Sequence, residues 1–167
     1  MKSRPRARML GMKTVMRKLR KEVDAIEGRT MKGLIRATIA IRTATEKQSP
    51  ITPVDQGNLY NSWFTSTTKG VISIPNTGKF EGDNSVNLKN QHETVKQMAS
   101  TMSKRMGKRQ PVVTYGFSAN YAFWVHENYN KKINWKRPGA GPGFFISSIK
   151  QSQKQVLEII KREAQIK

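Results

Sequence analysis

The chain has 167 residues and a net charge of +20, from 31 Lys and Arg against 11 Asp and Glu. This length predicts one domain, and the lack of cysteine excludes disulfides, thiolate metal sites and cysteine nucleophiles. No apolar run reaches the roughly 18 residues of a membrane span. The charge favours a polyanion such as nucleic acid, although a solvated surface or an acidic protein partner would also account for it.

The positive charge is concentrated at the two ends of the sequence. Residues 1–50 carry 14 basic and 4 acidic side chains, residues 51–100 carry 4 of each, and residues 101–167 carry 13 and 3. Residues 1–11 alternate basic residues with Pro and Gly and show no apolar period, which predicts a basic arm ordered by a partner. Its candidates for facing DNA or a partner are Arg4, Arg6 and Arg8.

Residues 12–49 predict a long helical region. Apolar residues from Met12 to Ile26 recur at spacings of three and four, and the pattern resumes at Leu34. Gly28 and Gly33 weaken the middle, which predicts a bend or a short break there. The region is too long for one small sheet to cover, so we expect part of it to contact other subunits.

Residues 50–78 predict a corner followed by a β-hairpin. Each proline disfavours helical geometry in the preceding residue, so the helix should end by about residue 49. An Asp and a Gly then predict a tight turn. The first strand is expected at residues 59–67 and its hairpin partner at residues 71–74. The structural corner consists of Pro50, Pro53, Asp55 and Gly57.

Residues 79–110 predict a helical insertion with a polar helix from about Leu88 to Met106. Its apolar stripe is narrow and rich in Met, which predicts a helix that is loosely packed or docked on a neighbouring molecule. The stripe consists of Gln91, Val95, Met98, Met102 and Met106. A basic cluster at its end either complements the helix dipole or contacts phosphate. This cluster consists of Lys104, Arg105, Lys108 and Arg109.

Residues 111–167 predict a strand at 112–117, a short helix, a basic loop and a C-terminal helix. Ser118 is expected to cap the short helix. The side chains that should lay this helix against the sheet are Tyr121, Ala122, Trp124 and Val125. The loop at 128–143 is long enough to be functional or mobile, and its basic candidates are Lys131, Lys132, Lys136 and Arg137. In the last helix, at 144–165, the stripe Phe145, Ile149 and Val156 places Glu163 on the outer face.

The sequence contains no recognisable catalytic constellation. Its two histidines, His92 and His126, are 34 residues apart, and Glu127 is expected to pair with a loop lysine. No P-loop or dinucleotide fingerprint is present, and the acids are too scattered for a two-metal cluster. We therefore expect a protein that is not an enzyme and that has no catalytic residue, metal or cofactor.

The predicted elements give an α+β fold. It has a long N-terminal helix, a small antiparallel β-sheet, a short helix and a C-terminal helix packed on the sheet, and a helical insertion. Three short motifs accompany this order of elements. They are Pro-Val-Asp-Gln-Gly-Asn-Leu-Tyr-Asn-Ser at 53–62, Tyr-Ala-Phe-Trp-Val-His-Glu at 121–127, and Pro-Gly-Phe-Phe at 142–145.

With these motifs the chain resembles the head–tail joining proteins of tailed bacteriophages, also called tail-completion or neck proteins. That family has Pro-Val-x-Thr-Gly-x-Leu-x-x-Ser at the corner, Tyr-Ala-x-x-Val-Glu after the sheet and Pro-Phe-Leu at the last helix. Here Gln replaces Thr, and the second and third motifs each contain one extra residue. The insertion at 79–110 and the basic arm also depart from the family pattern.

The resemblance implies a structural virion protein that forms a homo-oligomeric ring in the neck, around the channel through which DNA leaves the head. It implies portal or adaptor proteins on the head side and tail-terminator or tail-tube proteins on the tail side. It also implies non-specific contact with packaged DNA, no membrane, and assembly in the host cytoplasm. Two alternatives stay open. One is a stand-alone basic nucleic-acid-binding protein, with Tyr129 and Trp135 stacking on bases; the other is a tail terminator or another minor tail component.

Overall fold

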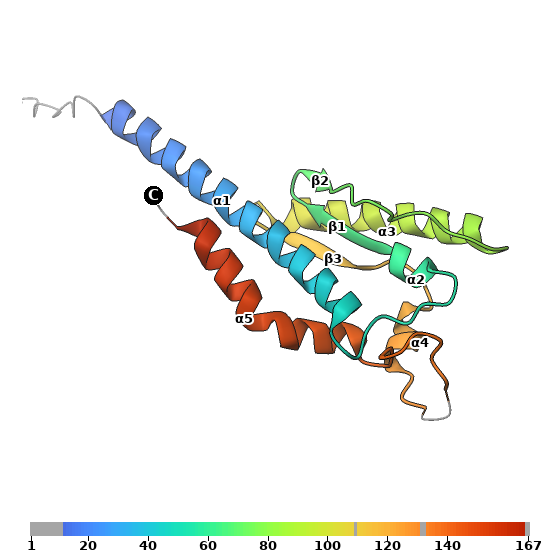
Figure 1. Ribbon diagram of the computed structural model, residues 1–167. Helices are drawn as coiled ribbons and strands as arrows, with labels where there is room; N and C mark the ends of the chain where they lie inside the picture. The colour runs from blue at the N-terminus through green and yellow to red at the C-terminus, as the bar shows by residue number, and fades with distance from the viewer. Residues whose placement is uncertain (1–11, 109, 131–132, 166–167) are drawn as a thin grey trace, which may run out of the picture.

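The computed structural model describes residues 12–108, 110–130 and 133–165, and it has an α+β fold in three layers (Figure 1). A three-stranded antiparallel sheet of order β2-β1-β3 forms the middle layer. The strands are β1 (Trp63–Thr67), β2 (Gly70–Val71) and β3 (Val113–Phe117). Helices α1 (Met12–Lys47) and α5 (Phe144–Ala164) cover one face, α3 (Ser85–Met106) covers the other, and α2 (Asn58–Asn61) and α4 (Ala122–Glu127) are short. The predicted fold class is confirmed.

Helix α1 runs without interruption from Met12 to Lys47 and is drawn straight (Figure 1), so the predicted bend or short break at Gly28 and Gly33 is wrong. Gly33 is buried where α5 packs on α1. A Cβ atom at Gly33 would lie 3.2 Å from the Cβ of Glu163 and 3.3 Å from the Cα of Ile160. The missing side chain thus lets the two helices approach closely, and this packing offsets the helical cost of glycine, which is at most about 1 kcal/mol.

The N-terminal segment of α1, up to about residue 23, extends beyond the rest of the described chain (Figure 1), and we call residues 14–23 the projecting segment. Val15, Leu19 and Val23 are 60%, 55% and 45% exposed, whereas Ala37 and Ala44 further along are buried. This confirms that the fold leaves part of the helix uncovered. Contact of that part with other subunits stays a prediction.

The corner differs from the prediction because residues 58–61 form the helical turn α2 and β1 begins only at Trp63. Gly57 has a φ of 80°, as a left-handed turn residue requires. The amide of Asn61 donates to the Gly57 carbonyl at 2.9 Å. The side chain of Asn58 accepts from the Glu81 amide at 2.8 Å and donates to its carbonyl at 2.9 Å. One local backbone bond and two bonds from Asn58 to residue 81, which is 23 residues further along the chain, thus hold a helical turn where a strand was expected.

The predicted hairpin partner of β1 is shorter than expected. Regular pairing in β2 covers only Gly70 and Val71. One further ladder bond, from the Ile72 amide to the Thr65 carbonyl at 2.8 Å, continues beyond it. The hairpin therefore forms as predicted, with two paired residues in its second strand.

Aromatic rings fill the space between the sheet and α5. Trp63 is 1% exposed, and its ring centroid lies 5.1 Å from that of Phe117 in an edge-to-face arrangement. Phe145 of α5 packs edge-on against both rings, at 6.1 and 5.7 Å. Such pairs add about 0.5–1.5 kcal/mol each beyond their burial. This cluster fixes α5 on the sheet.

On the opposite face, α3 packs through residues other than the predicted stripe. Leu88, His92, Ala99 and Ser103 are buried. The predicted stripe lies outside, with Met98, Met102 and Met106 at 66%, 56% and 54% exposed. Hydrogen bonds explain the difference: Ser103 bonds Thr114 at 2.8 Å, and His92 bonds Ser118 at 2.7 Å. Ser118 therefore binds this histidine and does not cap a helix, which corrects that prediction.

Two side chains near the C-terminal end also correct the sequence interpretation. Trp124 is 72% exposed and does not lie against the sheet. The side chain of Glu163 is 13% exposed and forms ion pairs with Lys32 and Arg36, so it faces α1 and not solvent. In both cases the helical spacing was correct, but the packed side of the helix was not.

We predict that Gly107→Ala destabilises the fold by about 1–3 kcal/mol through overpacking. A Cβ atom at Gly107 would lie 1.9 Å from the Cγ2 of Thr68 and 2.8 Å from the carbonyl oxygen of Ser103. Gly28→Ala is the matched control. Nothing lies within 4 Å of its new Cβ, so this change should stabilise α1 by about 0.5–1 kcal/mol. Urea unfolding measures both, and equal effects of the two changes would contradict the packing at Gly107.

We predict that His92 makes the fold less stable in mild acid. Burial first, and then the charge of Lys96, lower the pKa of its imidazole, although Glu93 opposes the shift. Below a pH of about 6.5 the His92 imidazole takes up a proton in the unfolded chain but resists it in the folded chain. The free energy of unfolding therefore decreases as the pH is lowered. His92→Gln should flatten this dependence between about pH 7 and 5. Unfolding titrations across that range test it, and an unchanged slope would exclude His92 as the cause.

Candidate functional site

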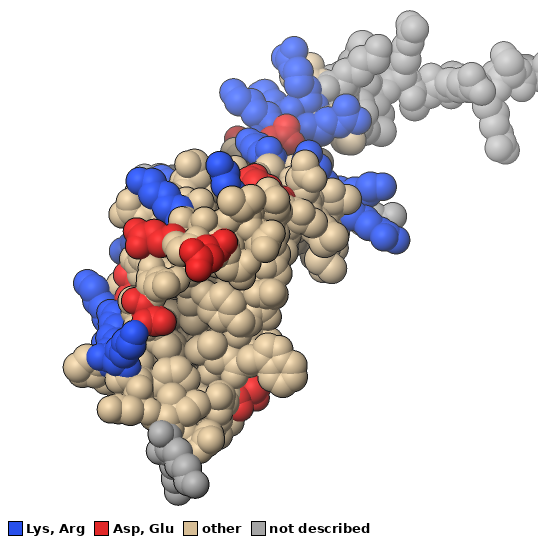
Figure 2. Space-filling view, turned by 90° about the vertical axis from the view of Figure 1, so that its right-hand side faces the viewer, with Lys and Arg blue, Asp and Glu red and all other residues tan. Residues whose placement is uncertain are grey.

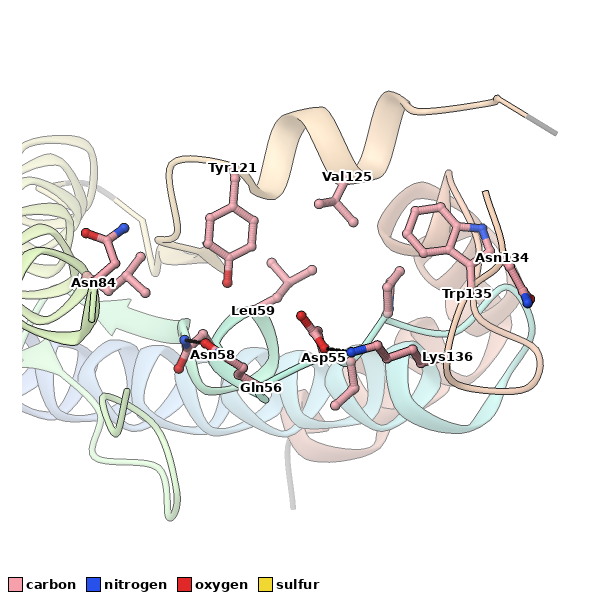
Figure 3. A pocket seen from close by; sticks show the side chains of 13 residues that line it. Asp55, Gln56, Asn58, Leu59, Asn84, Tyr121, Val125, Asn134, Trp135 and Lys136 are labelled. Carbon is pink, nitrogen blue, oxygen red and sulfur yellow. Dashed lines mark hydrogen bonds and ion pairs between the residues drawn. The ribbon is translucent and has the colours of Figure 1, made fainter. Parts of the chain in front are cut away.

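A pocket of about 480 Å³ opens beside the corner (Figure 3). Its apolar lining includes Leu59 from α2, Leu88 from α3 and Val125 from α4. Residues of the corner and of the loop at 133–143 complete the wall. We call this the corner pocket, and its lining residues are Pro53, Val54, Asp55, Gln56, Asn58, Leu59, Asn84, Leu88, Tyr121, Val125, Asn134, Trp135 and Lys136.

The charges of the corner pocket cancel. The Lys136 ammonium forms an ion pair with the Asp55 carboxylate, and both side chains are more than 70% exposed. The hydroxyl of Tyr121 points into the pocket (Figure 3). Burial, and secondarily the charge of Asp55, raise the pKa of Tyr121, so the phenol stays neutral at physiological pH. The pocket is therefore an apolar hollow with a neutral, polar rim.

Arg137 holds the loop onto the corner. Its guanidinium donates to the Glu46 carbonyl at 2.9 Å, in the last turn of α1, and to the Thr52 carbonyl at 3.4 Å. The Ile51 amide donates to the Gly139 carbonyl at 2.9 Å, which ties the same two segments together. A cation at the carbonyl end of a helix also interacts favourably with the helix dipole. Arg137 and Lys136 thus both bind acceptors within the chain.

His126 and Glu127 join α4 to the start of α5. Their side chains bond at 2.7 Å, and Nε2 of His126 accepts the amide of Ile146 at 3.3 Å. The Gly143 amide donates to the His126 carbonyl at 2.7 Å. The described partner of Glu127 is thus this histidine, where the sequence interpretation expected a loop lysine.

The predicted basic candidates do not form one surface. Lys104, Arg105 and Lys108 are exposed at the C-terminal end of α3. A hollow lined by Glu27 and Met31 of α1 and by Gly107, Gln110 and Pro111 places that end beside the middle of α1. This is far from the corner pocket (Figure 1). Six candidates lie outside the described residues: Arg4, Arg6, Arg8, Arg109, Lys131 and Lys132.

The projecting segment of α1 carries a basic surface that the sequence interpretation did not single out. Residues 14–21 contain four Lys or Arg and no acid, and all are exposed. The first turn of α1 has no acidic residue to balance the positive end of the helix dipole. Figure 2 shows the blue side chains gathered at this end. The run of cations on a helix too long to be covered was the available signal. We call Arg17, Lys18, Arg20 and Lys21 the α1 basic surface.

A second exposed feature lies on α4. Phe123 is 64% exposed and Trp124 is 72% exposed, and their rings meet edge to face with centroids 5.7 Å apart. Tyr121 and Val125 of the same segment face the corner pocket (Figure 3). We call Phe123 and Trp124 the aromatic knob. Its exposure in water is unfavourable and is typical of a contact surface.

We predict that Arg137→Ala costs about 1–3 kcal/mol of folding free energy, because two carbonyl acceptors lose a charged donor. Lys136→Ala is the matched control. Its ion pair is solvent-exposed on both sides, so we expect a change within about 0.5 kcal/mol. Urea unfolding distinguishes them, and equal costs would contradict the anchoring role of Arg137.

Among the described residues, no group of three His, Asp or Glu is placed to hold a metal ion, and no helix combines the length and apolarity of a membrane span. Comparison of the chain with protein-family models, curated proteins and solved structures gave no significant match.

Proposed function

We propose that this chain is a structural virion protein of a tailed bacteriophage, forming a ring in the neck that joins the head to the tail and surrounds the DNA exit channel. The observation that carries the proposal is the projecting segment of α1, residues 14–23, with its exposed apolar side chains and its four cations. A helical segment of this length is marginal in water without packing partners. A subunit built for an assembly provides those partners.

The motif segments support the same function. Residues 53–62, 121–127 and 142–145, which carry the resemblance to neck proteins, are brought together around the corner pocket and the start of α5. Sequences distant in the chain thus share one structural unit. The proposed partners are further copies of the chain, portal or adaptor proteins on the head side, and tail-terminator or tail-tube proteins on the tail side.

In the proposed ring the α1 basic surface faces packaged DNA or an acidic neighbour. Each subunit adds its charge to the ring, and the resulting field attracts a polyanion over several ångströms at physiological salt. The contact is non-specific, since phosphates carry no sequence information.

A second candidate is a stand-alone nucleic-acid-binding protein, which the α1 basic surface also favours. The loop contributes less to this function than its sequence suggested, because Trp135 is half-buried in the corner pocket. Salt-dependent binding of free DNA by the monomer would favour this candidate. Rings seen by electron microscopy, without such binding, would favour the neck protein.

We predict that the triple change Arg17→Glu, Lys18→Glu and Lys21→Glu lowers head–tail joining at least about tenfold, because the surface then repels polyanions. The control reverses Lys89, Lys150 and Lys154, which are exposed on α3 and α5 and change the net charge equally. Joining is scored by electron microscopy and infectivity of particles assembled without wild-type protein. Normal joining by the α1 variant would remove this surface from the mechanism.

A further inference from the structure

We infer that copies of this chain join head to tail by inserting the aromatic knob of one copy into the corner pocket of the next. The inference rests on the proposed ring and names the contact that builds it. Knob and pocket use different faces of the same segment, since Tyr121 and Val125 line the pocket while Phe123 and Trp124 are turned to solvent. A chain cannot fill its own pocket with this knob, whereas a second copy can.

The sizes of knob and pocket match. The pocket encloses about 480 Å³, within the usual range of roughly 300–1,000 Å³ for sites that enclose a small ligand. An indole or phenyl ring fits such a space. Burying the exposed parts of Phe123 and Trp124 would remove on the order of 300 Å² of surface. A standard interface buries about 800 Å² per partner, so the knob supplies a large share and the rims supply the rest.

Electrostatics favour this contact over others between copies. At a net charge of +20, two chains repel each other wherever their cations meet. The segment from Ala119 to Val125 carries no charge, and the Asp55–Lys136 pair neutralises the pocket. Both lie at the opposite end of the molecule from the α1 basic surface (Figure 1).

The pocket also offers suitable polar partners for the indole N–H. Its rim carries acceptor oxygens from Gln56, Asn84 and Asn134. A tryptophan buried at an interface usually finds such an acceptor. The combination of an apolar floor and an amide rim therefore fits a tryptophan better than a purely aliphatic side chain.

A contact between two different surfaces of the same chain has a defined geometric consequence. Each copy keeps one free knob or one free pocket, so association continues until the rotation closes a ring. A two-fold dimer would leave neither surface free. Reciprocal insertion in a two-fold dimer would stop at two copies, whereas the head-to-tail contact generates a closed ring or an open filament. Association of the wild-type chain beyond two copies therefore distinguishes the head-to-tail contact from a reciprocal dimer.

Sedimentation velocity of the full chain tests the inference, at about 0.5 M NaCl to screen the net charge and up to about 0.5 mM protein. We expect the wild-type chain to self-associate and Trp124→Ala to weaken association at least tenfold. Leu157→Ala, which truncates a 50% exposed apolar side chain on α5, is the control and should change nothing. Circular dichroism confirms that each variant is folded.

A mixing experiment distinguishes two different surfaces from a symmetric contact. Asn134→Trp fills the pocket from an exposed position on its wall and leaves the knob intact. Each variant alone should stay monomeric, while a mixture of Trp124→Ala and Asn134→Trp should form a one-to-one pair and nothing larger. That pair would establish the contact.

Four results would each overturn the inference. They are a monomeric wild-type chain, unaltered association of Trp124→Ala, equal weakening by Leu157→Ala, and a mixture that does not pair. These results are independent of the head–tail joining assay. If rings form through other surfaces, this inference is wrong but the proposed function is not. If rings form through the knob but do not support head–tail joining, the proposed function is wrong but the contact is not.

Discussion

The arrangement of this chain depends on one mismatch: α1 has 36 residues and the antiparallel helix packed on it, α5, has 21. At 1.5 Å per residue their lengths are about 54 and 32 Å. The two helices pack closely at Gly33, beside Ile160 and Glu163, where α5 is about to end. The apolar stripe of α1 continues beyond this point, half-buried at Met31 and Ile26 and then exposed from Val23 to Val15. A helix is not extended by several turns of exposed apolar residues unless something else packs there, which is why α1 is central to the proposed function.

The sequence predicted the helices well because their signals are local. Periodicity located α1, α3 and α5, and the prolines located the end of α1. The sequence interpretation failed where a residue distant in the chain decides how a helix packs. Gly33 reads as a helix breaker until Ile160 is seen to require it. The packed face of α3 was missed because hydrophobicity selects Met98 and Met102, whereas the structure buries His92 and Ser103 with hydrogen-bond partners on β3 or just after it. Burial of a polar group costs little when it is paired, and only the fold shows the pair.

The candidate site was predictable only in part, because here too distant residues decide the outcome. The sequence shows how many cations a segment has, but not whether each is already bound to an acceptor within the chain. Arg137 donates to two carbonyl groups, and Lys136 pairs with Asp55, so neither is as free as its loop position suggested. The cations of residues 14–21 were passed over as the polar side of an ordinary amphipathic helix. These cations are a candidate binding surface because no described element lies beside them, and this depends on where α5 ends.

The α1 basic surface and the proposed knob-and-pocket contact lie at opposite ends of the molecule (Figure 1), and this separation addresses a problem that any assembly of such a basic chain must meet. Copies that touched through the α1 basic surface would bring like charges together, which is costly at short range even in salt. Copies that touch through α4 and the corner pocket bring together an uncharged aromatic pair and a neutralised rim. The α1 basic surface of each copy then takes no part in this proposed contact and stays free to bind a polyanion, and binding of the polyanion would relieve repulsion between copies. Self-association and polyanion binding would therefore reinforce each other, since each copy added to a ring strengthens the field that holds the polyanion.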